Sequence, residues 1–327
     1  METFTDWFAL AQQWLFEAAV QPLAFHLGAA NRLEQAYDGT GWLLVGLLQV
    51  AVLAVVIGPM QRLWPVEAVT DRRAVRVDVL YTLLHRLGLF KLVMFFTFEN
   101  WLEEGIGMLR AKGLPTLHLD QLWPGVTDQA LPSFFIYLVA FDFAGYWLHR
   151  AQHRFEWWWA LHALHHAQRQ MTMWTDNRNH LLDDVLRDLI FVVLAIAIGV
   201  APGQFVALVA LSQLSESFQH ANLRMWFGRI GERLWVSPRF HRMHHAIGTG
   251  HESADRPHTL VDGRSPALGG CNFGVLLPWW DMLFGTANFA LRYDGTGVRD
   301  QVENGRDYGT GFWVQQWLGL KRLAGRA

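Results

Sequence analysis

Residues 132–166 read PSFFIYLVAFDFAGYWLHRAQHRFEWWWALHALHH, and this stretch indicates the fold of the chain. It begins with an apolar run, residues 132–148, that holds a single acid, Asp142. Runs of roughly this length cross the hydrocarbon core of a bilayer as a helix. His149 and His153 follow at once, four residues apart, so they share one face of the same helix. The stretch predicts a membrane helix that carries imidazoles at one end.

Histidines recur with helical spacing in two further groups. The pattern HxxHH occurs at residues 162–166 and again at residues 241–245. Residues three or four apart lie on one helix face, so each group directs its imidazoles to one point. Imidazole binds iron, copper, nickel and zinc. The first pair alone would equally fit a polar helix cap at the lipid headgroups, but the repeated HxxHH favours metal binding. Eight imidazoles exceed the coordination of one ion, so we predict two ions. The eight residues are His149, His153, His162, His165, His166, His241, His244 and His245.

The composition agrees with a membrane protein. Hydrophobic residues make up 52% of the 327 residues and charged residues only 17%, against about 25% charged in soluble domains. The net charge of −2 and the lack of a basic stripe argue against a nucleic-acid partner. The single Cys271 excludes a disulfide framework and any CxxC motif. The N-terminus lacks the basic start of a signal peptide, so we expect the chain to be held by helices that it keeps.

Four further segments complete the predicted bundle. Residues 41–60 hold no charge and form the clearest span. Residues 77–98 are interrupted by charges, and we expect one helix with its early charges near an interface. Residues 189–211 are broken by Pro202-Gly203, where a helical hairpin would return His220 to the side of the other histidines. Residues 7–27 are mixed and predict an interfacial helix on the opposite face. The predicted fold is an all-α membrane bundle of four to five spans with a histidine-rich di-metal cap.

Arginines set the expected orientation, because short cytoplasmic loops are enriched in Lys and Arg. They gather between the first two spans and after the third, whereas residues 99–127 hold few. The histidine groups are therefore expected in the cytoplasm. We divide the chain into an N-terminal anchoring part (1–128), a catalytic part (129–290) and a cytoplasmic tail (291–327).

The three histidine boxes, in this order and beside membrane spans, resemble those of the fatty acid hydroxylase/sterol desaturase superfamily. Four further stretches resemble that family's pattern: residues 142–147 (DFAGYW), 178–180 (RNH), 219–222 (QHAN) and 272–286 (NFG…WDMLFGT). The resemblance covers roughly residues 130–290. It implies a membrane-bound di-iron oxygenase that uses two iron ions, O2 as co-substrate and external electrons to hydroxylate or desaturate a lipid. Sterol, fatty acyl and ether lipids all remain open.

The resemblance also adds residues to the predicted site. His220 is similar to an extra ligand between the second and third boxes. His180 and Asn222 match family positions and are candidates for contacts behind the ligands, with ligation left open for His180. Asp142 is costly inside a membrane unless paired. It would hold a ligand histidine through the other ring nitrogen, or pair with Arg150.

The electrons must come from another protein, because the chain has no GxGxxG fingerprint and no cysteine cluster. A ferredoxin, cytochrome or flavoprotein reductase is expected. Two other classes remain open. A haem electron carrier would use single histidines on paired spans. A zinc hydrolase would use three protein ligands and a general-base carboxylate, but the chain has no HExxH. A serine esterase is disfavoured because GxSxG is absent.

Several features outside the three histidine boxes carry expectations of their own. The segment 246–270 is longer than the family's usual connection and is either a lid or a solvated loop, which we favour. His85 is expected to be a hydrogen-bonded core residue. The isolated histidines are expected to have no site role, and Trp157, Trp158 and Trp159 stay unassigned although they could line a lipid tunnel. The isolated histidines are His26, His118, His251 and His258.

Overall fold

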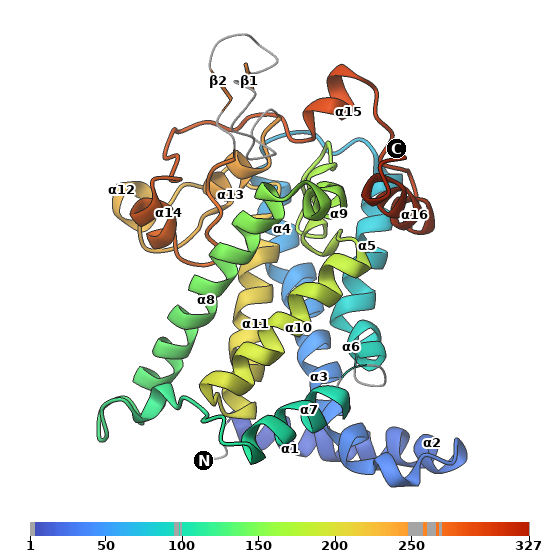
Figure 1. Cartoon of the computed structure of the whole chain (residues 1–327). Coiled ribbons are helices and arrows are strands. Elements are labelled where there is room, and N and C mark those ends of the chain that lie inside the picture. Colours follow the sequence, from blue (N-terminus) through green and yellow to red (C-terminus); the bar gives the residue numbers. More distant parts are fainter. Residues whose placement is uncertain are drawn as a thin grey trace.

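The computed structural model describes residues 4–94, 98, 100–247, 258–259, 266–267 and 270–326. The described chain is helical apart from one two-residue pair, β1 (His258–Thr259) with β2 (Pro266–Ala267), which confirms the predicted all-α class. Helices α3, α5, α8, α10 and α11 form the body of the molecule, and α9, α13, α15 and α16 lie at one end of it (Figure 1). Helices α1, α2 and α7 lie across the opposite end.

Two helices are long and apolar enough to cross a membrane among the described residues, Ala30–Leu63 and Ala130–Arg154. The first combines η2 (Ala30–Arg32), α3 (Leu33–Val52), η3 (Leu53–Ile57) and α4 (Gly58–Leu63). The second is α8 (Ala130–Arg154), whose large apolar side chains Leu131, Phe135, Phe143 and Trp147 are exposed at four-residue multiples along one face. An apolar stripe of this kind needs a lipid or protein partner. The helices predicted over 41–60 and 132–148 are therefore present, and both are candidate spans.

The prediction of a single helix over residues 77–98 is wrong. The chain forms α5 (Arg72–Arg86) and α6 (Leu89–Met94), separated at Gly88, whose φ of 79° is left-handed and ends the helix. Residues 95–97 lie outside the described residues. The early charges are paired inside the protein, and their position near a membrane interface stays a prediction. Asp78 is buried and accepts a hydrogen bond of 2.6 Å from Arg178, and Arg86 is buried against Asp176 at 2.9 Å.

The predicted hairpin is confirmed. Helix α10 (Leu181–Ile198) ends at Gly199, in the left-handed region, and α11 (Pro202–Gln219) begins with Pro202 in its first turn. The turn therefore comprises residues 199–201 and precedes Pro202, because proline fits the first turn of a helix, where its missing N–H is not needed. The hydroxyl of Tyr137 lies 3.2 Å from the carbonyl oxygens of both Ile198 and Gly199 and ties the turn to α8.

The N-terminal segment predicted as one interfacial helix forms three consecutive pieces, α1 (Phe4–Leu15), η1 (Phe16–Val20) and α2 (Gln21–His26). They lie across the end of the molecule that is opposite α9 and α13 (Figure 1). Trp7, Trp14 and Phe25 are exposed along them. Their insertion into a membrane interface stays a prediction.

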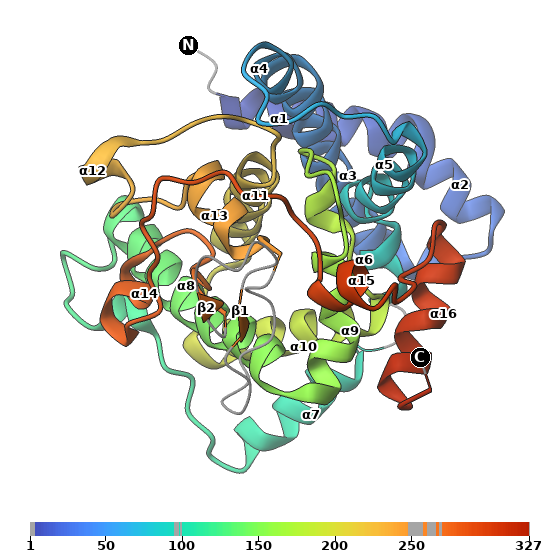
Figure 2. The same cartoon turned by 90° about the horizontal axis from the view of Figure 1, so that it is seen from above.

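The helices at the histidine end are short. They are α9 (Glu156–His166), η6 (Thr175–Asn177), α12 (Gly228–Gly231), α13 (Pro238–His244), α14 (Trp279–Phe284), α15 (Arg299–Glu303) and α16 (Phe312–Leu323). At the other end lie α7 (Asn100–Ala111) and η5 (Leu119–Gln121). Seen from above, α8, α9, α11 and α13 lie around the centre of the molecule (Figure 2).

The final helix, α16, packs on α9 and α5. Its Gln316 donates a hydrogen bond of 2.9 Å to the hydroxyl of Tyr81 in α5. A Cβ at Gly319 would lie 2.2 Å from the ring of His180, so only glycine allows this approach. The part of the chain predicted as a tail is therefore fastened to the body of the protein.

Candidate metal centre

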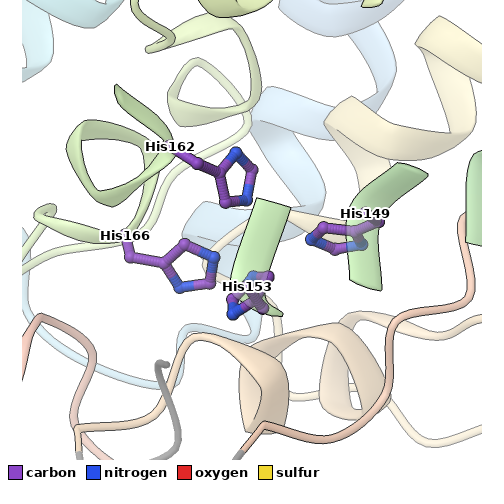
Figure 3. A group of neighbouring side chains, drawn as sticks. All are labelled: His149, His153, His162 and His166. Carbon is purple, nitrogen blue, oxygen red and sulfur yellow. The ribbon is translucent and has the colours of Figure 1, made fainter. Parts of the chain in front are cut away.

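Four histidines from α8 and α9 face one another. The chain turns at Phe155, which has extended backbone between the two helices, so the i, i+4 pair of α8 meets the i, i+4 pair of α9. One ring nitrogen of each histidine lies within 4.8 Å of those of the others (Figure 3). We call these residues the first group: His149, His153, His162 and His166.

A second group forms beside it from three elements. His165 comes from α9, His220 follows α11, and His241 and His245 come from α13 and its end. Their nearest ring nitrogens lie within 4.8 Å of one another as well. His244 lies between the groups, near His166 and His245. Parts of all three sequence boxes therefore converge, and His220 joins them. The second group is His165, His220, His241 and His245.

The spacing of the nitrogens fits a metal ion. The Nε2 atom of His220 lies 3.2 Å from Nε2 of His165 and 3.0 Å from Nε2 of His241, which lies 3.0 Å from Nε2 of His245. Nitrogens held about 2.0–2.1 Å from one ion, as in His–zinc bonds, lie roughly 3.0–3.4 Å from each other. In the first group, Nε2 of His162 and of His166 are buried and form no hydrogen bond to any described residue. Both groups therefore present the donor atoms that a metal requires.

Burial disfavours the charged form of six of these imidazoles. Desolvation, with the neighbouring imidazoles as the next cause, lowers the pKa of each of five histidines well below its ordinary value. Burial also lowers the pKa of His220. The neutral imidazole is the form that binds metals, so the centre is ready to coordinate ions at pH 7. The five histidines are His165, His166, His241, His244 and His245.

Backbone carbonyls hold the opposite ring nitrogens. The Nδ1 atoms of His149, His244 and His220 lie 2.9, 2.7 and 2.7 Å from the carbonyl oxygens of Phe273, Cys271 and Glu216, respectively. A carbonyl oxygen can only accept, so each Nδ1 carries the proton and each Nε2 keeps its lone pair. This selects the tautomer that coordinates through Nε2.

Asp183 is the main acidic contact behind the histidines. Its Oδ2 lies 3.1 Å from Nδ1 of His162, and its Oδ1 accepts hydrogen bonds from Gln152 at 2.8 Å and Trp158 at 2.7 Å. It lies in the first turn of α10 and is buried. Sequence reasoning missed Asp183. Its only local signal was an acid at the start of an apolar helix, which equally fits a favourable interaction with the helix dipole.

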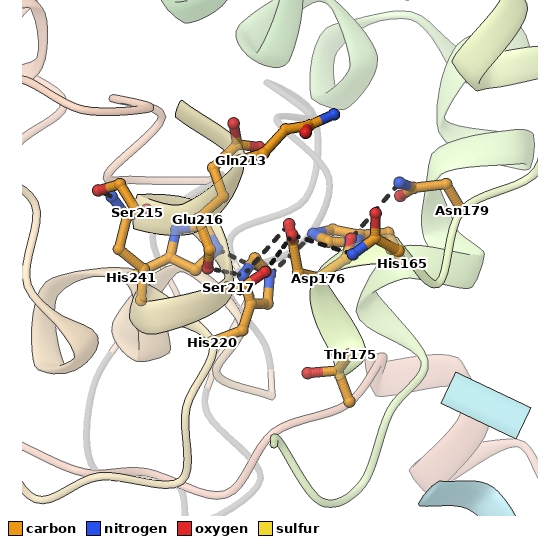
Figure 4. Close-up of polar contacts among 12 residues, drawn as sticks. His165, Thr175, Asp176, Asn179, Gln213, Ser215, Glu216, Ser217, His220 and His241 are labelled. Carbon is orange, nitrogen blue, oxygen red and sulfur yellow. Dashed lines mark hydrogen bonds and ion pairs between the residues drawn. The ribbon is translucent and has the colours of Figure 1, made fainter. Parts of the chain in front are cut away.

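Asp176 supports the second group. Its Oδ1 lies 3.8 Å from Nδ1 of His220, and its Oδ2 accepts hydrogen bonds of 2.9 Å from Ser217 and Arg86 (Figure 4). Arg86 also donates to the carbonyl of Gln213 at 2.8 Å. Helices α5 and α11 are therefore linked behind His220. Sequence reasoning also missed Asp176.

The three residues predicted to lie behind the ligands have other tasks. Asp142 accepts hydrogen bonds from the backbone of Leu276 and Leu277 and from Trp280, so the expected contact with a ligand histidine or Arg150 is wrong. Its carboxylate instead fastens α8 to the segment that also supplies the Phe273 carbonyl. A buried carboxylate needs several donors, and backbone amides supply them.

His180 lies outside both groups. Its Nδ1 caps α10 by accepting from Leu182 at 3.2 Å, and its Nε2 donates to the carbonyl of Gln316 at 2.9 Å. Asn222 accepts hydrogen bonds from the backbone of Val66 and Glu67 and thereby holds the connection between α4 and α5. Both residues are structural, and among the described residues neither forms a hydrogen bond with a histidine of the two groups.

The remaining expectations have mixed outcomes. His85 lies 3.3 Å from Asp184 and is nearly buried, as predicted for a core histidine. Trp158 bonds to Asp183, and Trp159 packs beside His153, with ring centroids 5.0 Å apart. Neither lines the cavity beside the centre. Most of the segment 246–270, with His251 and the side chain of His258, lies outside the described residues.

A cavity of about 230 Å³ adjoins both histidine groups. His149 and His162 of the first group and His165, His220 and His241 of the second line it. It continues between α8, α10 and α11, where its walls include Leu138, Phe141, Phe191, Phe205 and Leu208. A ligand in this cavity would therefore contact histidines of both groups from the side that faces the cavity.

Comparisons with known proteins agree with this arrangement. Residues 134–286 match the model of the family described as Fatty acid hydroxylase. The chain is 24% identical over 272 residues to an ornithine lipid hydroxylase, OlsE, of Rhizobium tropici, covering 80% of this chain and 72% of the relative.

Two other relatives are alkylglycerol monooxygenases. The protein of Xenopus tropicalis is 24% identical over 47% of this chain, and that of Caenorhabditis elegans is 26% identical over 50%. The chain spans only 30% and 28% of their respective lengths. No solved structure gives a significant match. The relatives named here are lipid-oxidising enzymes, and the family match covers all three histidine boxes.

Proposed function

We propose that this chain is a membrane-bound, non-haem di-iron oxygenase of lipids, because residues 134–286 match the fatty acid hydroxylase family and the chain is similar to a lipid hydroxylase over 80% of its length. It hydroxylates or desaturates a C–H bond with O2 and electrons from another protein. In hydroxylation, one oxygen atom enters the C–H bond and the other leaves as water, which consumes two electrons and two protons. Hydroxylation is favoured because the relatives are a hydroxylase and a monooxygenase.

The observation that carries this proposal is the pair of neighbouring histidine groups on one cavity. Bound iron would supply the activation of O2 that an unactivated C–H bond requires. The chain supplies the nitrogen donors, keeps them neutral by burial, and fixes their tautomers through carbonyls and Asp183. The proposed ligands are His149, His153, His162, His165, His166, His220, His241, His244 and His245.

Two alternative functions fit less well. A haem with two axial histidines needs room for a flat macrocycle between their nitrogens, whereas Nε2 of His220 lies only 3.0 and 3.2 Å from its neighbours. A zinc hydrolase usually has three protein ligands and a carboxylate as general base. The carboxylate of Asp183 contacts the first group, but it reaches His162 from behind, through Nδ1.

The proposal includes a location and partners. Residues 1–128 would anchor the chain, residues 129–290 would form the catalytic part, and residues 291–327 would lie on the cytoplasmic side with the histidine groups. The chain would cross the membrane several times, with the α10–α11 hairpin inserted from the histidine side. A cytoplasmic ferredoxin, cytochrome or flavoprotein reductase would deliver electrons, and the substrate would be a fatty acyl, sterol, ether or other membrane lipid.

The test combines metal analysis with oxygen labelling. Purified protein should hold about two irons per chain, without the Soret band of haem. With a reductase system and membrane lipids, it should transfer one atom of ¹⁸O2 into a lipid product. Lipid profiles of cells with and without the protein should then identify the substrate. Equal lipid oxidation with and without O2, or full activity without iron, would refute the proposed function.

A further inference from the structure

The cavity beside the histidine groups changes its chemistry along α11. Glu216 and Gln213 line it one and two turns before His220, and Leu208 and Phe205 line it further along. Glu216 lies about 6 Å from His220 along the helix axis, and Phe205 lies roughly 22 Å away, at a rise of 1.5 Å per residue. Glu216 and Gln213 belong to the same helix as His220 and are shown with it in Figure 4. The wall is therefore polar near the metal centre and apolar toward the hairpin turn.

Helix α10 shows the same gradient. On α10, Asp184, Arg187 and Asp188 line the cavity within two turns of Asp183, which holds His162. Phe191 and Val192 line it one turn later, toward the hairpin turn. Helices α10 and α11 thus place charged groups nearer the histidines and apolar groups toward the hairpin turn. A ligand that matches this cavity is amphipathic, with its polar end at the metal centre.

Most of the charged side chains have partners. Asp184 lies 3.3 Å from His85 and 3.5 Å from Arg187, and Arg187 lies 3.9 Å from Asp188. Asp183 and Asp176 are bound as described above.

Two charged side chains of the cavity wall, one acidic and one basic, have no ion-pair partner among the described residues. Within the described part of the chain, neither the carboxylate of Glu216 nor the ammonium of Lys91 forms an ion pair or a hydrogen bond. Lys91 instead lies over the ring of Trp42, with Nζ 3.7 Å from its centroid. Both residues line the cavity. Enclosed charges are costly unless they are paired. The cavity therefore offers one carboxylate and one ammonium to a ligand.

We infer that this cavity binds the headgroup of a zwitterionic lipid beside the metal centre. The ammonium group of the lipid is held by Glu216, its carboxylate or phosphate is held by Lys91, and its chain extends toward the α10–α11 turn. The inference rests on the proposed function and specifies its substrate class. The carbon exposed to the histidine groups then belongs to the headgroup or its immediate neighbours, and carbons far along an acyl chain lie out of reach.

The first experiment measures lipid binding without turnover. Iron-loaded protein in detergent is titrated anaerobically with four lipids and followed by native mass spectrometry. They are phosphatidylethanolamine, an aminoacyl lipid with a free carboxylate and ammonium but no phosphate, phosphatidylglycerol and diacylglycerol. We expect at least one of the first two to bind about tenfold or more tightly than the last two, because only zwitterions pair both charges. The lipid that binds more tightly of these two shows whether the anionic group held by Lys91 is a phosphate or a carboxylate.

Variants then test the two residues. Glu216→Gln and Lys91→Met should each reduce the preference for the zwitterion by about tenfold, whereas Glu216→Asp should retain part of it. Glu34→Gln, at an exposed position of α3, is the matched control and should bind as the wild type does. Equal binding of all four lipids by the wild type overturns the inference, even where a variant fails to fold. Unchanged preference in a folded Glu216→Gln protein overturns it too.

The second experiment locates the product oxygen. Tandem mass spectrometry of the lipid after aerobic turnover should place the added oxygen in the headgroup fragment or on the carbons next to it. Selective binding without any oxidation would refute the proposed function and leave the headgroup site standing. Oxidation far along an acyl chain without a headgroup preference would support the function and overturn this inference.

Discussion

Replacing Asp183 by Asn should remove one metal site and spare the other. The carboxylate accepts from His162 at one oxygen and from Gln152 and Trp158 at the other. An amide can replace only one of these oxygens as an acceptor. If the amide oxygen still accepts the hydrogen bonds of Gln152 and Trp158, the amide NH2 group faces Nδ1 of His162. That nitrogen must then accept, so the proton moves to Nε2 and blocks coordination. The opposite orientation sets the amide donor against two other donors and is less favourable.

The expected magnitude follows from the role of such contacts. Removing a partner behind a ligand histidine typically weakens metal affinity 10–100-fold, or roughly 1.4–2.8 kcal/mol. Only the first group includes His162, so the second group should keep its ion. Iron per chain is measured by mass spectrometry after dialysis against graded chelator. At concentrations where the wild type retains about two irons, Asp183→Asn should retain about one. Asp128→Asn, an exposed control, should match the wild type. Two irons held at wild-type affinity in Asp183→Asn would refute the argument.

Three further predictions address the site, the packing and the topology. His165→Ala should abolish lipid oxidation with normal membrane insertion, while His258→Ala, outside the three histidine boxes of the sequence, should retain turnover; wild-type turnover by His165→Ala would count against the centre. Gly46→Ala should lower stability by about 1–3 kcal/mol, because its Cβ would lie 1.6 Å from the carbonyl oxygen of Arg86, whereas Gly39→Ala, with nothing within 4 Å, should be neutral or stabilising in a thermal melt. A cysteine at exposed Gly203 should react with an impermeant thiol reagent from the non-cytoplasmic side, against the background of the buried Cys271; labelling from the cytoplasmic side alone would contradict the hairpin topology.

The sequence predicted best what depends on local spacing. The i, i+3 and i, i+4 histidines had to share helix faces, and Pro202 marked the hairpin to within a few residues. The break at Gly88 was harder to predict, because a single glycine is also tolerated inside helices. Its left-handed backbone becomes evident only in the structure.

The contacts behind the histidines could not be derived from spacing. Asp183 is 21 residues from His162, and Cys271 is 27 residues from His244. Asp142 was correctly recognised as an acid that needed partners, but its partners are amides more than 130 residues away. Such pairings depend on how the helices pack, and carbonyl acceptors have no residue-type signal at all, because every residue carries one.

The packing of α16 has a consequence for the order in which the protein is assembled. Gln316 and Gly319 hold His180, His180 caps the start of α10, and the first turn of α10 carries Asp183, which sets the tautomer of His162. Helix α16, which is synthesised after every histidine box, thus contributes to a binding site whose first ligand was synthesised some 170 residues earlier. A nascent chain that stops before α16 would already contain every histidine, yet its first group would lack this support. Iron loading of that group would therefore report that α16 has been synthesised and has packed on α9.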